Sequence, residues 1–299
     1  MDIGQVIFSP TIIMLVGINA ITGLGLYLTV ATGQFSLGHA AFMAIGAYTS
    51  GILTVKLNLP LVPALIVAAA AASLVGIIFG LPALRTRGTY LAVITLGLGE
   101  LVRVFFSSVE YVGGVSGMNG MRGTTPLLVV TTLVICAVFV KWLMGTPLGR
   151  AFEAIGQDEV VAESIGINTT RLKVAAFALG AALAGVGGAL YAHLMFFIDP
   201  PMFDYNYSVL ILLLMIFGGM ETPWGAILGA AILTPLPELV RGLDHWRMLI
   251  YGAILVFMMA VRSQGLLSKR SIKRLKYLFK RTQKAPVLSG QVGVKADQE

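Results

Sequence analysis

The feature that most constrains this chain is the length of its uncharged stretches. No Asp, Glu, Lys or Arg occurs between Asp2 and Lys56, or between Lys56 and Arg85. A helix needs about 20 apolar residues to cross the hydrocarbon core of a bilayer, so the first interval is long enough for two crossings and the second for one. The chain is 57% hydrophobic and only 12% charged, which leaves too few charges to cover a water-soluble domain. The sequence therefore predicts an integral membrane protein.

The apolar stretches predict about nine crossings, within a range of eight to ten. The first interval is interrupted near residues 33–39, where Gly and polar side chains replace the aliphatic run. Further apolar blocks lie at 61–83, 88–108, 124–144, 172–195, 206–219, 224–240 and 247–262. Residues 64–72 are apolar throughout, without the alternation that a transmembrane β-barrel needs. The expected fold class is an all-α, polytopic transmembrane helical bundle.

Two blocks are short for a full span. They flank Glu221, where Gly218, Gly219, Pro223 and Gly225 allow a helix to break. Such breaks are tolerated inside a membrane protein where other groups satisfy the freed backbone. We therefore expect a broken or re-entrant helix in this part of the chain.

The positions of Lys and Arg predict the orientation, because cytoplasmic loops retain positive charge. One alternating set of loops is rich in bases, at Arg85, Arg87, Lys141, Arg150, Arg171, Lys173 and Arg262. The other set mixes bases with acids. The first set and the C-terminus are therefore expected to be cytoplasmic. Residues 268–299 form a separate basic tail with eight Lys and Arg residues between 269 and 284, either solvated or lying on anionic lipid.

Several kinds of site are missing. The sequence has no G-x-x-x-x-G-K-[ST] phosphate loop, so the chain is not expected to hydrolyse ATP by that route. His39, His193 and His245 are far apart and match no zinc-ligand spacing. Cys136 is the single cysteine, which excludes a disulfide or a Cys metal site within one chain. We expect no cofactor bound by this chain, no metal site and no nucleic-acid partner.

The longest polar stretch between predicted spans is residues 148–172, on the predicted cytoplasmic side. Its apolar residues, including Val160, Val161 and Ile165, recur at helical spacing. This pattern predicts one or two short amphipathic helices that end near Gly166. Their apolar face needs cover, which either the groove of a partner protein or the bilayer and the chain's own loops could provide.

Polar side chains inside the apolar blocks form two groups. Glu100 and Arg103 are three residues apart on one helix face, and each bare charge costs roughly 2.5 kcal/mol or more at that depth. They form either a structural ion pair between helices or part of a pathway or gate. Gln34, Ser36 and His39 lie in the Gly-rich break of the first interval. They could line a translocation pathway or hold helices together by hydrogen bonds.

Several segments resemble a known family, in order from about residue 11 to residue 267. Residues 32–48, 100–103, 113–120, 149–168 and 217–229 are similar to the LivM-type permeases of bacterial branched-chain amino acid ABC importers. The resemblance implies a permease domain over 1–267 in the bacterial cytoplasmic (inner) membrane. It also implies four partners besides lipid: a second related permease, two cytoplasmic ATPases that hold ATP and Mg, and an external solute-binding protein.

The resemblance also assigns a role to the polar stretch, which is similar to the "EAA" loop whose short helix docks in a cleft of the ATPase. By this likeness the ATPase-coupling residues are Arg150, Glu153, Gln157, Asp158, Glu159, Ala162, Glu163 and Gly166. ATP binding would close the ATPase pair, move the docked loops and switch the permease pair between outward and inward openings. Residues 159–162 read Glu-Val-Val-Ala and depart from a literal Glu-Ala-Ala.

Three alternatives remain. The same kind of permease could carry urea, short amides or other amino acids. A secondary transporter driven by an ion gradient would show several intramembrane acids, whereas Glu100 is the clear example here. An intramembrane serine protease would use Ser116 of Gly114-Val-Ser-Gly with His193, but Ser116 falls in a predicted external loop and not in a buried position beside a base.

Overall fold

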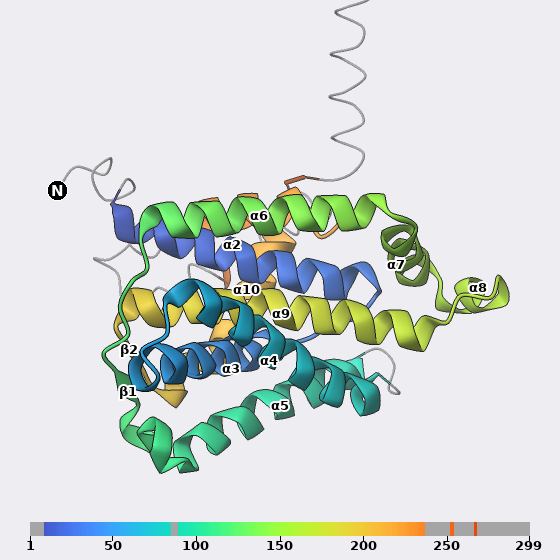
Figure 1. Cartoon of the computed structure of the whole chain (residues 1–299). Helices are drawn as coiled ribbons and strands as arrows, with labels where there is room; N and C mark the ends of the chain where they lie inside the picture. The colour runs from blue at the N-terminus through green and yellow to red at the C-terminus, as the bar shows by residue number, and fades with distance from the viewer. Residues whose placement is uncertain (1–8, 85–88, 237–251, 254–265, 268–299) are drawn as a thin grey trace, which may run out of the picture.

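The structure is a computed structural model that describes residues 9–84, 89–236, 252–253 and 266–267. Its helices and strands are α2 (Pro10–Ala31), α3 (His39–Gly51), the π-helix η1 (Ile52–Lys56), α4 (Leu61–Ala83), α5 (Thr89–Ser108), the 3-10 turns η2 (Glu110–Val112) and η3 (Gly114–Ser116), β1 (Met118–Asn119), α6 (Pro126–Gly145), α7 (Pro147–Gln157), α8 (Glu159–Ser164), α9 (Thr169–Met195), β2 (Phe197–Ile198), the 3-10 turn η4 (Pro200–Phe203), α10 (Tyr205–Gly218) and α11 (Pro223–Leu233). Figure 1 shows them as one layered helical bundle.

The predicted all-α membrane bundle is confirmed. Six helices in the described part of the chain are long and apolar enough to cross a membrane: Pro10–Ala31, Leu61–Ala83, Tyr90–Ser108, Pro126–Gly145, Thr169–Met195 and Pro200–Gly218. The helices α3 and α11 are shorter. The predicted block 247–262 and the tail 268–299 lie outside the described residues, apart from 252–253. The count of about nine spans therefore stays a prediction.

The helices α9 and α2 form the centre of the bundle. α9 packs along α2, α3 and α4, and glycines at the crossings let the backbones touch. A Cβ on Gly25 or Gly180 would overlap the backbone of the other helix, and the same holds for Gly46 and the backbone of Gly185. Small residues commonly permit this close approach in membranes, where helices gain little from the hydrophobic effect. Gly76 of α4 likewise lies against α9.

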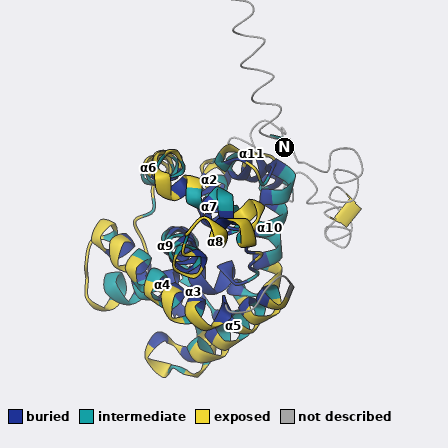
Figure 2. Cartoon of the chain, turned by 90° about the vertical axis from the view of Figure 1, so that its right-hand side faces the viewer, coloured by how far each residue is buried: buried dark blue, intermediate teal, exposed yellow. Residues whose placement is uncertain are grey.

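The outer helices α4, α5 and α6 carry exposed apolar side chains. In Figure 2 they show exposed positions on their outer sides, while α2, α9 and α3 are mostly buried. In the most hydrophobic 18-residue stretch of α6, only 22% is buried, compared with 78% in the corresponding stretch of α2. A helix that is apolar on its exposed side faces lipid or another membrane subunit.

The helices α10 and α11 form a short hairpin, as expected for a broken helix around Glu221. α10 ends at Gly218, and Gly219 takes a backbone φ of +117° that favours glycine. A Cβ on Gly229 would overlap the backbone of Leu214, so α10 and α11 pack closely. The two arms therefore lie in direct backbone contact.

The two ends of the bundle differ. β1 and β2 pair antiparallel at one end, with Met118 opposite Ile198. The helices α7 and α8 project at the opposite end (Figure 1). The α7–α8 end contains the whole of the predicted coupling segment, residues 148–172.

Candidate functional site

A non-helical segment interrupts the bundle between α2 and α3. Gln34 and Ser36 in residues 32–38 are buried, whereas Phe35 is 45% exposed. Two hydrogen bonds to other helices fix this segment and the first turn of α3. The Leu37 N–H donates to Thr95 Oγ1 of α5 at 2.9 Å, and the Ala40 N–H donates to Ser208 Oγ of α10 at 3.1 Å. Irregular backbone at membrane depth is tolerated only where protein or a water-filled cavity surrounds it. We call residues 32–38 the break segment.

The three predicted pathway residues of this region are all buried. Ser36 Oγ accepts from the Gly38 N–H at 3.2 Å and so shapes the turn. The side-chain polar atoms of Gln34 and His39 have no hydrogen-bond partner within the described residues. Leaving a buried polar group unpaired costs about 1–3 kcal/mol, so these two side chains are not explained by helix packing alone.

Glu100 and Arg103 form an ion pair, as their spacing allowed. Arg103 Nη2 lies 2.6 Å from Glu100 Oε2, and Arg103 Nε donates to the same oxygen at 2.9 Å. The pair lies within α5 and does not join two helices, as the first of the two alternatives required; the pathway or gating role stays a prediction. The side chains are 45% and 41% exposed. Charged side chains exposed to this degree would be unfavourable in contact with lipid hydrocarbon, so water or another subunit must cover them.

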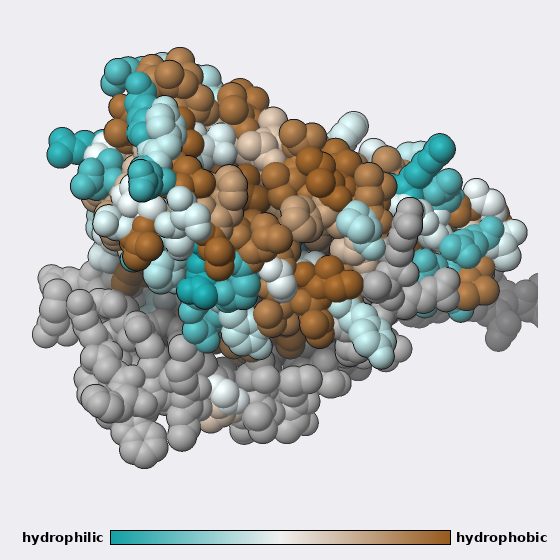
Figure 3. All heavy atoms as spheres, turned by 90° about the horizontal axis from the view of Figure 1, so that it is seen from below, coloured by the Kyte–Doolittle hydropathy of each residue, from teal (hydrophilic) through white to brown (hydrophobic). Residues whose placement is uncertain are grey.

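The face of the molecule on the α5 side is mixed. Figure 3, which looks at the bundle from the side of α5, shows a hydrophobic face with a hydrophilic patch away from both ends. A small pocket joins α5, the break segment and the start of α10; it is lined by Leu37, Ala40, Leu96, Gly99, Glu100, Phe203, Asp204, Tyr205 and Ser208. The Glu100 side and the break segment thus belong to one region.

The helix α7 begins the coupling segment directly after α6. Thr146 caps it by accepting from the Gly149 N–H at 3.4 Å, and Pro147 occupies the first helical position, where a missing N–H costs nothing. Phe152 and Ile155 are buried. Gly156 lies so close to the end of α2 that a Cβ there would overlap the Ala31 carbonyl. α7 therefore rests on the end of a central helix.

The helix α8 follows after one residue. Asp158 ends α7 in an extended conformation and caps α8, since its Oδ1 accepts from the N–H groups of Val160 and Val161 at 2.9 and 3.1 Å. Gly166, with a φ of +85°, ends the helix, and the Ile167 N–H donates back to the Ala162 carbonyl. Two short helices ending near Gly166 are thus confirmed.

Polar residues of α8 fasten it to α9. Glu159 pairs with Lys173 at 2.6 Å, and Thr169 Oγ1 donates to Glu163 Oε1 at 2.7 Å. Ala162 is buried beneath the helix. These residues build the coupling segment and orient it. Of the other predicted coupling residues, Arg150 and Gln157 are exposed.

The helix α8 and the residue that follows it expose three apolar side chains, beside the exposed Glu163 and Ser164. Val160 is 65% exposed, Val161 56% and Ile165 69%. We call these three residues the α8 apolar face. These three residues were not among the coupling residues that the likeness to the EAA loop predicted. Their helical spacing in the sequence did predict an apolar face that needs cover.

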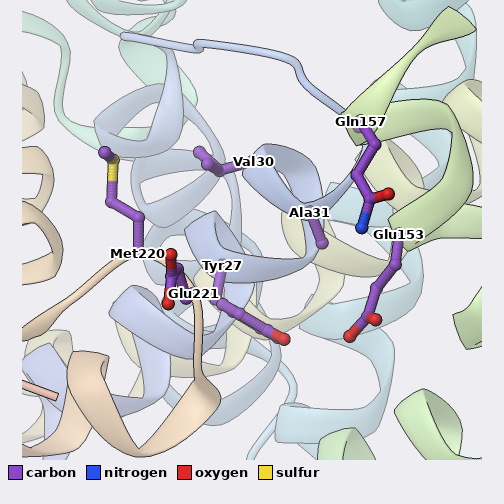
Figure 4. A pocket seen from close by; sticks show the side chains of 8 residues that line it. Tyr27, Val30, Ala31, Glu153, Gln157, Met220 and Glu221 are labelled. Atoms are coloured by element: carbon purple, nitrogen blue, oxygen red, sulfur yellow. The ribbon is translucent and has the colours of Figure 1, made fainter. Parts of the chain in front are cut away.

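Between α2, α7 and the α10–α11 turn lies a pocket of about 260 Å³, which we call the inner pocket. It is lined by Tyr27, Val30, Ala31, Glu153, Gly156, Gln157, Met220 and Glu221. Figure 4 shows Glu221 on one side of Tyr27 and Glu153 and Gln157 on the other. Two predicted coupling residues, Glu153 and the exposed Gln157, therefore line this pocket.

The residues suggested for a protease do not form a catalytic pair. Both ring nitrogens of His193 have partners, Thr54 Oγ1 at 2.9 Å and the Ala189 carbonyl at 2.8 Å. Ser116 is exposed on η3. Within the described residues, no group of three or more His, Cys, Asp and Glu side chains could hold a metal ion.

Comparison with known proteins places these features in context. A family model described as "Branched-chain amino acid transport system / permease component" matches residues 10–259. The high-affinity branched-chain amino acid transport system permease proteins LivM of Salmonella typhimurium and Escherichia coli are each 34% identical over 287 residues, which cover 84% of this chain and 68% of the relative. The autoinducer 2 import system permease protein LsrC of Yersinia pestis is 26% identical over 258 residues, covering 81% and 67%. No solved structure matches the chain.

Proposed function

The chain belongs to the family of branched-chain amino acid transport permeases, and from this premise we propose that it is a transmembrane subunit of an ATP-driven importer for leucine, isoleucine and valine. It is a multi-pass membrane protein and a transport subunit, not an enzyme, since its relatives are permeases. The observation that carries the substrate class is the 34% identity to permeases named for branched-chain amino acid transport. Relatives named for autoinducer 2 import are less similar, at 26%.

In this proposal the α7–α8 end is cytoplasmic and docks an ATPase through the α8 apolar face. The basic residues near it support that orientation, which also makes the C-terminus cytoplasmic and the membrane the bacterial inner membrane. ATP and Mg bind to two partner ATPases, because this chain has no phosphate loop. An apolar cleft suits Val160, Val161 and Ile165, because burying these side chains there is more favourable than leaving them in water.

The break segment and the Glu100 side of α5 form this subunit's share of the translocation pathway. Discontinuous helices supply polar backbone and side-chain groups at the binding sites of many transporters. The unpaired side chains of Gln34 and His39 and the half-exposed Glu100–Arg103 pair need polar contacts that lipid cannot offer. A second related permease facing α5 would enclose these groups in a hydrated pathway, while an external binding protein delivers the solute at the β1–β2 end.

Reconstituted transport tests the function. The complete transporter, with its binding protein and ATPases in vesicles, should accumulate labelled leucine only in the presence of ATP. Urea and short amides should not compete at equal concentration. Accumulation of urea instead of leucine would overturn the substrate class. Uptake by this chain alone, without nucleotide, would overturn the ATP-driven class.

The charges of α5 offer a test of the pathway. We expect Glu100→Gln to reduce ATP-driven uptake at least about tenfold, because the charge of Arg103 is then no longer balanced beside the pathway. The charge swap Glu100→Arg with Arg103→Glu keeps an ion pair and should restore the folded transporter but not the wild-type uptake rate, since the charges facing the pathway are exchanged. Full recovery of uptake by the swap would assign the pair a purely structural role.

A further inference from the structure

The exposed residues of α5 form a stripe along the helix. They recur at alternating intervals of four and three residues, at Tyr90, Ile94, Gly97, Leu101, Val104 and Ser108. We call these six residues the α5 seam. This is the heptad spacing with which one helix packs its side chains between those of another. A stripe of this kind can face lipid or a second helix, and the residues on it and beside it decide between the two.

Two features distinguish α5 from the other outer helices, α4 and α6. Gly97 leaves a notch in the middle of the seam, where an added Cβ would meet nothing within 4 Å. Glu100 and Arg103 lie half-exposed beside it. On α4, and on α6 as far as Phe139, the exposed residues are apolar, apart from Thr131, whose hydroxyl donates to a carbonyl of its own helix. Lipid suits those two faces, whereas small residues and charges are typical of contacts between membrane helices.

The ion pair borders the seam on the side of the pathway region. Successive residues of an α-helix are about 100° apart, which places Glu100 about 60° from Gly97 around the α5 axis. Glu100 also lines the small pocket that α5 shares with the break segment. A helix packed on the α5 seam would therefore cover Glu100 and close this region from lipid.

A second copy of this chain would cover Glu100 poorly. In the heptad of the seam, Glu100 takes a g position and Phe105 the following e position, and a g residue of one helix faces an e residue of the other in a parallel pair. Two copies would therefore place the apolar ring of Phe105, which is 56% exposed, opposite Glu100. A helix of different sequence can present a polar or basic side chain there instead. The charges thus favour a related but non-identical subunit.

We propose that the α5 seam packs directly against a membrane-spanning helix of the second, related permease. The partner helix fills the notch at Gly97 with a large side chain and offers a polar or basic group to Glu100. The inference rests on the proposed function, which supplies the second permease, and it names the surface through which the two subunits meet. The outward faces of α4 and α6 are left to lipid.

Photo-cross-linking in the complete transporter tests the contact. The photoreactive residue p-benzoylphenylalanine is placed at position 101, in place of Leu101 of α5, or at position 135, in place of Ile135 of α6, which is also apolar and exposed. Illumination should join position 101 to the second permease, identified by its own tag and mass, at least about fivefold more than position 135. Equal yields, adducts of position 101 with lipid only, or adducts with a second copy of this chain would each overturn the proposal.

Filling the notch provides a second arm. Gly97→Leu should reduce recovery of the second permease with this chain at least about tenfold, because the larger side chain holds the partner helix away. Gly145→Leu is the matched control on α6, since Gly145 also has nothing within 4 Å, and it should leave recovery unchanged. The thermal midpoint of the isolated chain should not fall in either variant. Undiminished recovery with Gly97→Leu would mean that no helix packs at the notch.

The two arms separate this contact from the proposed function, because neither requires ATP or solute. ATP-driven leucine uptake together with lipid adducts at position 101 would overturn the α5 contact alone. Adducts with the second permease, in a transporter that does not accumulate leucine, would support the contact and overturn the substrate class.

Discussion

Replacing Val160 and Val161 with glutamate should release the ATPase subunits from an otherwise intact permease. The two valines are two of the three residues of the α8 apolar face and are 65% and 56% exposed, so the change costs little in the isolated chain. In a docked complex it places two carboxylates against an apolar cleft. Burying a carboxylate there without a partner is unfavourable. A penalty of about 1.4 kcal/mol for each of the two charges raises the dissociation constant about 100-fold, because each 1.4 kcal/mol is a tenfold change. Copurification of the ATPases measures this, and ATP-driven uptake should fall in parallel.

Two controls separate docking from damage. Thr170→Glu adds a carboxylate to the exposed first turn of α9, outside the α8 apolar face, and should leave ATPase recovery unchanged. Val160→Leu with Val161→Ile keeps the face apolar and should also retain the ATPases. If the double glutamate variant copurifies the ATPases as well as the wild type does, α8 does not dock them through this face.

The bounds of several spans, though not their number, could be predicted closely from the sequence, because one physical requirement sets them. A segment in hydrocarbon needs an unbroken apolar run of fixed length, and a charge or a Gly and Pro cluster ends it visibly. The predicted block 61–83 coincides with α4, Leu61–Ala83. The interruption predicted near 33–39 appears as the break segment, between Ala31 and His39.

The partners of the polar residues could not be predicted, because they are set by packing between distant parts of the chain. Nothing in the sequence links Leu37 to Thr95, 58 positions away. The acids of the coupling segment were assigned to the ATPase by resemblance, yet Glu159 binds Lys173 and Glu153 faces the inner pocket. The α8 apolar face is exposed, and the helical spacing of hydrophobic residues in the sequence was the signal that indicated it.

Gly46 and Gly97 form a matched pair of positions for the second large effect. Both lie in helices, and both can be changed to alanine by adding one methyl group. At Gly46 that methyl would overlap the backbone of Gly185 in α9, whereas at Gly97 of α5 nothing lies within 4 Å. Alanine favours the helix over glycine by roughly 0.8–1.0 kcal/mol, so local helix propensity predicts a gain in stability at both sites.

At Gly46, the contact with α9 turns the expected gain in stability into a loss. Backbone atoms cannot move aside as a flexible side chain can, so α3 and α9 must separate along the crossing and lose packing on both sides. We expect Gly46→Ala to destabilise the permease by about 3 kcal/mol or more, enough to lose most of the folded protein on heating in detergent. Gly97→Ala should match or exceed the wild-type midpoint in the same size-exclusion thermal assay. Equal midpoints for the two variants would mean that the α3–α9 crossing is not held by direct backbone contact.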